Sequence, residues 1–165
     1  MNLEETGMGF SAEIEMIGRA HELGLLTCPY VFDEEQAREM ARSGADLLVA
    51  HAGLTTKGSI GAKSAMTMPE AATFVRRIIE AGKNERSDVL VLCHGGPIAE
   101  PADVAWMIEH TVGLDGFFGA SSIERLATEV AITEQTRSFK SLQPAHKPVA
   151  LRGSDGSRQA DTGQG

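Results

Sequence analysis

Short apolar runs alternate with longer stretches of helical spacing along most of the chain. The apolar runs predict four strands, at residues 25–32, 46–51, 88–94 and 114–120. Each run is followed by a predicted helix, beginning at about Asp33, Pro69, Pro101 and Ser122. A further helix is predicted before them, at residues 11–24, with Ser11 as its N-cap and Gly24 closing its end. Because the runs are nearly continuous rather than alternating, we expect parallel strands covered by helices, the α/β class.

Two architectures fit four strand–helix units in this order. One is a small doubly wound sheet, and the other is half of a (β/α)8 barrel, which as a whole usually needs about 250 residues. The local pattern leaves both open. We expect one domain at residues 1–142, followed by a disordered tail at residues 143–165, because the tail is too rich in Gly, Pro, Ser and Gln to bury much surface.

The charge and hydropathy of the chain argue against two classes of binding partner. The 165 residues carry a net charge of −8 without a run of Lys or Arg, so nucleic acid is not expected as a partner. No apolar run approaches the roughly 20 residues that a bilayer requires, so no membrane partner is expected either. Cys28 and Cys93 lie far apart without the spacing of a redox pair or zinc site. We therefore expect a cytoplasmic protein with reduced thiols.

Ligands bind beyond the carboxyl ends of the strands in both architectures, so the residues that finish each strand are the candidate site. They fall into four sets: Tyr30 and Phe32; His51; His94 with Gly95 and Gly96; and Gly119 with Ser121 and Ser122.

His51 and His94 finish consecutive predicted strands. Parallel pairing would place them on the same rim, about 4.8 Å apart at the backbone. Imidazoles titrate near neutral pH, so the pair could transfer protons, or share a phosphate or a divalent ion. The alternative is that either is a hydrogen-bonded structural histidine. His21 and His110 lie in or at the end of predicted helices, where surface or helix-terminus roles are expected.

The stretch "GFFGASS" places its smallest residues where the last helix is predicted to begin. A phosphate needs unobstructed backbone N–H groups, small hydroxyl donors and a helix N-terminus, which Gly119, Ser121 and Ser122 would together supply. The "HGGP" stretch, with Gly95 and Gly96, would form the neighbouring loop. Alternatively, a serine simply caps the helix and Gly119 eases a turn.

The connection at residues 52–68 is about three times the usual length, as binding loops and lids often are. Its "GLTTKGS" only approaches a P-loop, because Ser59 stands where the lysine should be, so a nucleoside triphosphatase is not expected. As a lid, the loop would bring Lys57 or Lys63 to an anion; otherwise these are solvated surface lysines.

Several stretches closely resemble the phosphoenolpyruvate hydrolase-like family, a TIM-barrel signal-transduction domain. They are "LEETGMGFSAEIEMI", "GLLTCPYVF", "ADLLVAHAGLTTKGSIGAK", "LCHGGPIAEPAD" and "GFFGASSIERL", and the resemblance runs from about Leu3 to Leu142. It implies a (β/α)8 barrel related to phosphoenolpyruvate mutase and isocitrate lyase, of which the four strands would be the fifth to eighth. It also implies Mg²⁺, but the relatives' acidic ligands come mainly from earlier strands, so no metal ligand is assigned here.

The resemblance implies an enzyme that acts on a phosphorylated enol or keto acid such as phosphoenolpyruvate. His51 or His94 would assist the attack of water, and the phosphate would be held by Gly95, Gly96, Gly119, Ser121, Ser122 and Lys63. Two alternatives stay open. The chain is a module that senses a small phosphorylated or carboxylated metabolite without turnover, as fusions to bacterial transcriptional activators in the family suggest, or it is an inactive fragment.

A partial barrel leaves its two outer strands with unpaired backbone N–H and C=O groups, which invite pairing with another chain. We therefore expect either a homo-oligomer that closes the sheet or a separate polypeptide that supplies the complementing half of the barrel.

Overall fold

The structure is a computed structural model that describes residues 7, 9–59, 61–62 and 66–142, so Lys63 and the predicted tail lie outside the described residues. Four parallel strands form one sheet in the order β1-β2-β3-β4, which confirms the α/β class. The strands are β1 (Tyr30–Val31), β2 (Leu47–His51), β3 (Leu90–His94) and β4 (Gly116–Phe117). The helices are α1 (Phe10–Glu22), α2 (Glu34–Arg42), α3 (Met68–Glu85), α4 (Pro101–His110) and α5 (Arg125–Lys140).

Side-chain caps fix the starts of the central helices. Asp33 accepts a hydrogen bond from the Gln36 N–H at the start of α2, and Thr67 and Glu70 form a reciprocal capping box at the start of α3. Two predicted starts are wrong. The N-cap of α1 is Gly9 rather than Ser11, and α5 begins at Arg125 rather than Ser122, because residues 121–124 form a turn before it.

The first predicted strand is shorter than its apolar run. The carbonyls of Thr27 and Pro29 accept hydrogen bonds from the N–H groups of Leu47 and Val49, but the ladder proper is confined to Tyr30–Val31. Pro29 has no N–H with which to return a bond, which is the physical reason that the pairing is incomplete. Residues 25–26 precede the pairing and are largely exposed.

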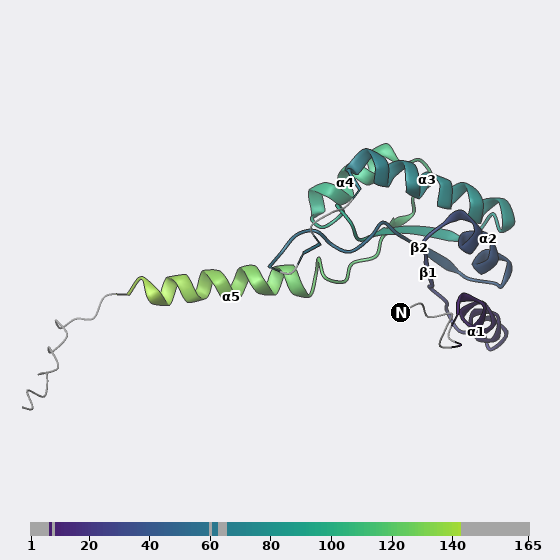
Figure 1. The fold of residues 1–165 in the computed structure, drawn as a ribbon, viewed down its shortest axis with the longest axis horizontal. Coiled ribbons are helices and arrows are strands. Elements are labelled where there is room, and N and C mark those ends of the chain that lie inside the picture. Colours follow the sequence, from purple (N-terminus) through teal and green to yellow (C-terminus); the bar gives the residue numbers. More distant parts are fainter. Residues whose placement is uncertain (1–6, 8, 60, 63–65, 143–165) are drawn as a thin grey trace, which may run out of the picture.

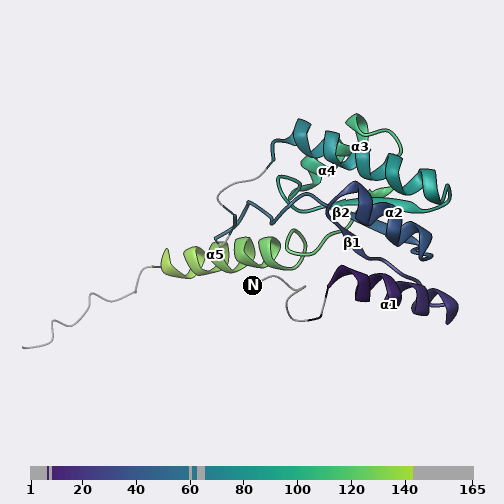
Figure 2. The ribbon, with the colours of Figure 1, turned by 45° about the vertical axis from the view of Figure 1, so that its right-hand side comes forward.

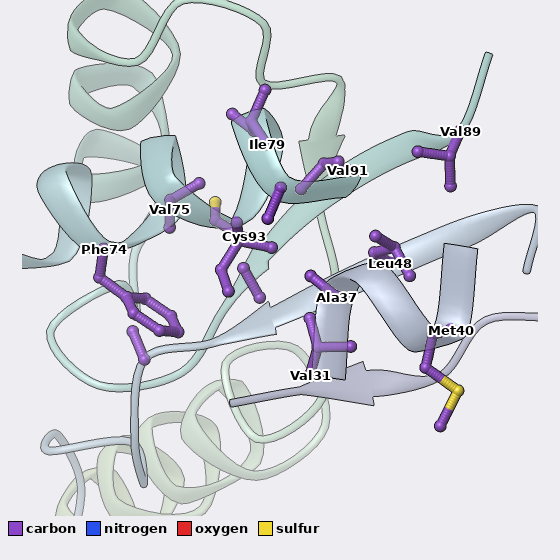
Figure 3. Close-up of a cluster of buried hydrophobic side chains, with 14 of the residues drawn as sticks. Val31, Ala37, Met40, Leu48, Phe74, Val75, Ile79, Val89, Val91 and Cys93 are labelled. Atoms are coloured by element: carbon purple, nitrogen blue, oxygen red, sulfur yellow. The ribbon is translucent and has the colours of Figure 1, made fainter. Parts of the chain in front are cut away.

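The hydrophobic core lies on one face of the sheet. Val31, Leu48, Val91 and Cys93 point from the strands into the layer formed by α2 and α3, where they meet side chains such as Met40 and Val75 (Figure 3). Alternate strand residues point to opposite faces, so Tyr30, His51 and His94 belong to the other face. On that face Leu90 is 45% exposed and Tyr30 is 38% exposed. Helices α2, α3 and α4 therefore cover one side of the sheet (Figure 1), and the other side stays partly exposed at these two residues.

The last helix departs from the packing of the others. Helices α2, α3 and α4 lie together over the sheet, whereas α5 projects away from the body (Figure 1). Its beginning lies beside the loop that follows β2, where Glu129 accepts hydrogen bonds from the backbone N–H and hydroxyl of Ser59 (Figure 2). No residue of α5 is buried. Among the described residues, no helix is long and apolar enough to cross a membrane.

Candidate functional site

His51 and His94 meet at the carboxyl ends of the two central strands. They are register partners in the β2–β3 ladder, and their ring centroids lie 4.9 Å apart with the planes inclined by 66°. His94 is 9% exposed and His51 is half-buried. The sheet thus brings the two predicted histidines together on the face opposite α2 and α3 (Figure 3).

The hydrogen bonds of the two rings assign opposite proton positions. His94 Nδ1 lies 2.7 Å from the carbonyl oxygen of Phe118, which can only accept, so this nitrogen carries the proton. His51 Nδ1 accepts from the N–H of Gly53 at 3.2 Å, so in the neutral ring the proton is on Nε2. The neutral pair therefore offers one Nε2 donor, on His51, and one Nε2 acceptor, on His94.

Burial lowers the pKa of His51, and the neighbouring His94 lowers it further. An unfolded histidine binds its proton near pH 6.5, whereas the folded chain resists protonation of His51. His51 should therefore make its full contribution to stability above about pH 6.5. This contribution should be lost as the pH falls through the lower folded-state pKa.

His51→Gln should show a smaller fall in stability on acidification than the wild type. Urea unfolding between about pH 7.5 and pH 5 measures it. His110→Gln is the control, since His110 is exposed at the end of α4 and stacks on Trp106. An identical pH dependence in wild type and His51→Gln would contradict a lowered pKa of His51 in the folded chain.

Three aromatic rings surround the histidines. The Tyr30 ring centroid lies 5.1 Å from that of His51 and 5.2 Å from that of His94, and Phe32 and Phe118 each flank one histidine at 5.0 and 5.6 Å. Burial raises the pKa of Tyr30, so its hydroxyl stays protonated. Sequence reasoning missed Phe118; its place directly after β4, on the same face as His94, is the signal that could have found it.

Gly95 and Gly96 allow the loop after β3 to touch the loop after β2, at the edge of the sheet where His51 and His94 lie. Both have positive φ, +74° and +57°, and a Cβ at Gly95 would lie 2.2 Å from the carbonyl oxygen of Gly53. The N–H of Gly96 donates to that same oxygen at 2.7 Å. This N–H is therefore not free for a phosphate, while the N–H of Gly95 has no acceptor among the described residues.

The turn before α5 also carries free backbone donors. The N–H groups of Gly119, Ala120, Ser121 and Ser122 have no acceptor within the described part of the chain. Neither serine caps the helix, since α5 has no side-chain cap.

The first of these N–H groups does not face the histidines. The carbonyl of Phe118 faces His94, so the N–H of Gly119, on the opposite side of the same trans peptide, points away from it. Ser122 lines a groove with Glu100 and Pro101 of the α4 region. No backbone hydrogen bond among the described residues joins this turn to the loop of Gly95 and Gly96.

Lys57 is held by acidic side chains rather than left free for a ligand. Its Nζ lies 2.9 Å from Glu100 and 3.2 Å from Asp103, which also accepts from the backbone N–H groups of Ala99 and Glu100. These contacts, that with Glu100 first, raise the pKa of Lys57. The long loop is therefore fastened to the start of α4.

Metal ions are held in proteins by clusters of His, Cys, Asp or Glu side chains. The described residues contain no group of three or more such side chains placed to hold a metal ion. The rim offers imidazole nitrogens, whereas Mg²⁺ prefers oxygen ligands. Cys28 and Cys93 are free, and burial raises the pKa of the Cys93 thiol to about 11, which makes it a packing group rather than a ligand or nucleophile.

Comparison with known proteins identifies relatives of this chain. Two proteins of tomato (Solanum lycopersicum), the ToMV susceptible protein tm-1(GCR26) and the ToMV resistance protein Tm-1(GCR237), are each 52% identical over 141 residues. A putative transcriptional regulatory protein, y4pA of Sinorhizobium fredii, is 28% identical over 148 residues. The matches cover 86% and 90% of this chain, but the chain spans only 19% and 24% of the length of these relatives.

A solved structure, that of the BexX/CysO complex of Amycolatopsis orientalis, is similar with a TM-score of 0.47 and 16% identity, over 86% of this chain and 55% of that one. A family model described as phosphoenolpyruvate hydrolase-like matches residues 1–142. The chain therefore belongs to the phosphoenolpyruvate hydrolase-like family.

Proposed function

We propose that the chain carries the histidine rim of an enzyme that hydrolyses a phosphorylated enol or keto acid such as phosphoenolpyruvate. The observation that carries the proposal is the pairing of His51 and His94 on adjacent strands, with one Nε2 donor and one Nε2 acceptor. Family membership supports the substrate class. The aromatic rings beside the histidines would contact the apolar part of such a small acid.

The proposed chemistry follows from the two ring nitrogens. His94 Nε2 accepts a proton from the attacking water, whose oxygen bonds to phosphorus as the bond from phosphorus to the enol oxygen breaks. The N–H at His51 Nε2 donates a hydrogen bond to an oxygen on which negative charge builds. The released enolate takes up the proton that His94 accepted, which gives the keto acid and regenerates the neutral base, and phosphate leaves. The N–H of Gly95, which follows His94 directly and has no acceptor among the described residues, is a candidate donor to the phosphate.

The partly exposed face of the sheet also supports a more specific fold, a closed barrel. We infer that the four strands are part of a (β/α)8 barrel whose interior is the histidine face, because α2, α3 and α4 cover the opposite face (Figure 1) while Leu90 and Tyr30 stay partly exposed. Another copy or another polypeptide would close the barrel. The free thiols of Cys28 and Cys93 support a reducing compartment such as the cytoplasm.

A second candidate is a module that binds the same class of metabolite without turnover. It is favoured by the relative named as a putative transcriptional regulatory protein, which suggests that the domain also serves regulation. Both candidates use the same histidine rim, so they differ only in whether the phosphate ester is cleaved.

Adding phosphoenolpyruvate to the full chain should raise its melting temperature, because a ligand that binds only the folded state stabilises it. An enzyme should in addition release phosphate and pyruvate in equal amounts, measured together over time. Inorganic phosphate and pyruvate added without the ester are the control ligands. A melting shift without product supports the sensor, and neither shift nor product would overturn both candidates.

A further inference from the structure

Tyr30 carries a hydroxyl group at the histidine rim to which the proposed reaction gives no role. It is the single tyrosine of the sequence and lies on the edge strand β1, in register with Val49 of β2. Register partners of parallel strands point to the same face, and Val49 precedes His51 by two residues. The side chain of Tyr30 therefore shares a face with both histidines.

The ring of Tyr30 reaches across the ends of the strands. Its centroid lies at nearly equal distances from those of His51 and His94, 5.1 and 5.2 Å, and 5.7 Å from that of Phe118, which directly follows β4. A side chain that begins at one edge of the sheet thus extends toward the other edge. Because Tyr30 is 38% exposed, a molecule bound beside the histidines can contact it.

The hydroxyl of Tyr30 is available as a hydrogen-bond donor. Among the described residues Tyr30 makes ring contacts, but its hydroxyl has no hydrogen-bond partner. Burial raises the pKa of Tyr30, as does the neighbouring Cys28, so the phenol keeps its proton at neutral pH. A donor that is left to water in this way can be taken over by an acceptor atom of a ligand.

The carboxylate of a phosphorylated enol or keto acid needs a donor of its own. In the proposed reaction the N–H groups of Gly95 and His51 serve the phosphate and the oxygen on which charge builds. The ammonium of Lys57 is already paired with two carboxylates. The hydroxyl of Tyr30, on a ring that contacts both histidines, is a donor that remains.

We propose that Tyr30 is a specificity-determining residue whose hydroxyl donates a hydrogen bond to the carboxylate of the bound phosphorylated acid. This inference rests on the proposed function, because it assigns a second group of the same substrate. A hydrogen bond to a carboxylate is charge-assisted and therefore strong. The rim accordingly prefers an enol phosphate that carries a carboxylate to one that does not.

The bond should act on binding rather than on the chemical step. The carboxylate keeps its charge while the phosphate ester is cleaved, so its hydrogen bond is equally strong in the ground state and the transition state. Loss of the hydroxyl should therefore raise KM more than it lowers kcat. A role of Tyr30 in packing alone would not depend on whether the substrate has a carboxylate.

Substrate selectivity tests the role of the hydroxyl. Phosphate release by the full chain is measured with phosphoenolpyruvate and with vinyl phosphate, which keeps the enol phosphate but has no carboxylate. Wild type should prefer phosphoenolpyruvate, and Tyr30→Phe should reduce this preference in kcat/KM by about 10- to 100-fold, the scale of a hydrogen bond to a charged group. Phe32→Leu is the matched control, since it alters a ring 5.0 Å from His51 that has no hydroxyl, and should keep the wild-type preference.

Melting temperatures separate this proposal from the proposed hydrolysis. The shift caused by each of the two phosphates is measured for the same proteins. If neither is cleaved, hydrolysis is wrong, but a preference of wild type for phosphoenolpyruvate that Tyr30→Phe loses still supports the role of Tyr30. The same preference in wild type and Tyr30→Phe, or no preference in wild type, would overturn that role even where phosphate is released.

Discussion

Replacing His94 with alanine should lower the rate of phosphate release from phosphoenolpyruvate by about 10²-fold or more, the scale of general acid–base assistance. The variant loses the Nε2 lone pair that would accept the proton of the attacking water. Initial rates at saturating substrate, with phosphate and pyruvate both measured, give the effect. His110→Ala is the matched control, an exposed histidine on α4 that should leave the rate unchanged.

His94→Asn separates the chemical role from the structural one. The asparagine side chain can still donate an N–H toward the carbonyl of Phe118, as His94 Nδ1 does at 2.7 Å, but it has no nitrogen acceptor in place of Nε2. We expect a stability closer to wild type than that of His94→Ala, together with the same loss of rate. If His94→Asn kept the wild-type rate, His94 would be a structural histidine and the proposed base would be wrong.

Gly95→Ala should destabilise the chain more than any other single glycine substitution at this rim. A left-handed backbone at φ +74° costs a non-glycine residue about 1–2 kcal/mol. The new methyl group would also lie 2.2 Å from the carbonyl oxygen of Gly53, an overlap with backbone that costs about 1–3 kcal/mol more. Urea unfolding measures the sum as a change in midpoint.

Gly24→Ala isolates the backbone contribution. Gly24 also has a positive φ, +69°, but a Cβ there would meet nothing within 4 Å. It should therefore lose only about 1–2 kcal/mol. Equal losses in the two variants would mean that the loops at Gly53 and Gly95 separate easily, and that their close approach does not stabilise the rim.

The order and type of the elements could be read from the sequence because local signals agreed with the tertiary packing. Apolar runs marked the strands, Asp33 capped α2, and Gly24 closed α1 with a positive φ. Boundaries were less predictable where two local signals compete. Ser11 and Ser122 are both good capping residues by type, yet helix α1 starts before the first and α5 after the second.

The candidate site was predictable only in part. Parallel register alone was enough to bring His51 and His94 together. The anion cup needed more, because residue type does not show which way a peptide N–H points or whether it is already bonded. The N–H of Gly96 is already bonded to the carbonyl of Gly53, and the ammonium of Lys57 is paired with Glu100. These long-range partners come from loop conformations that one sequence does not specify.

Lys57 joins three parts of the molecule at one residue. Its ammonium binds Glu100 and Asp103 of the α4 region, and its carbonyl accepts from Arg125 of α5. Its neighbour Thr56 donates its N–H to the carbonyl of Gly96, two residues from His94. Arg125 thus ties the first turn of α5 to the same loop that contacts the glycines. The position of α5 and the loop that contacts the glycines beside His94 are therefore connected through a single backbone segment, Thr56–Lys57.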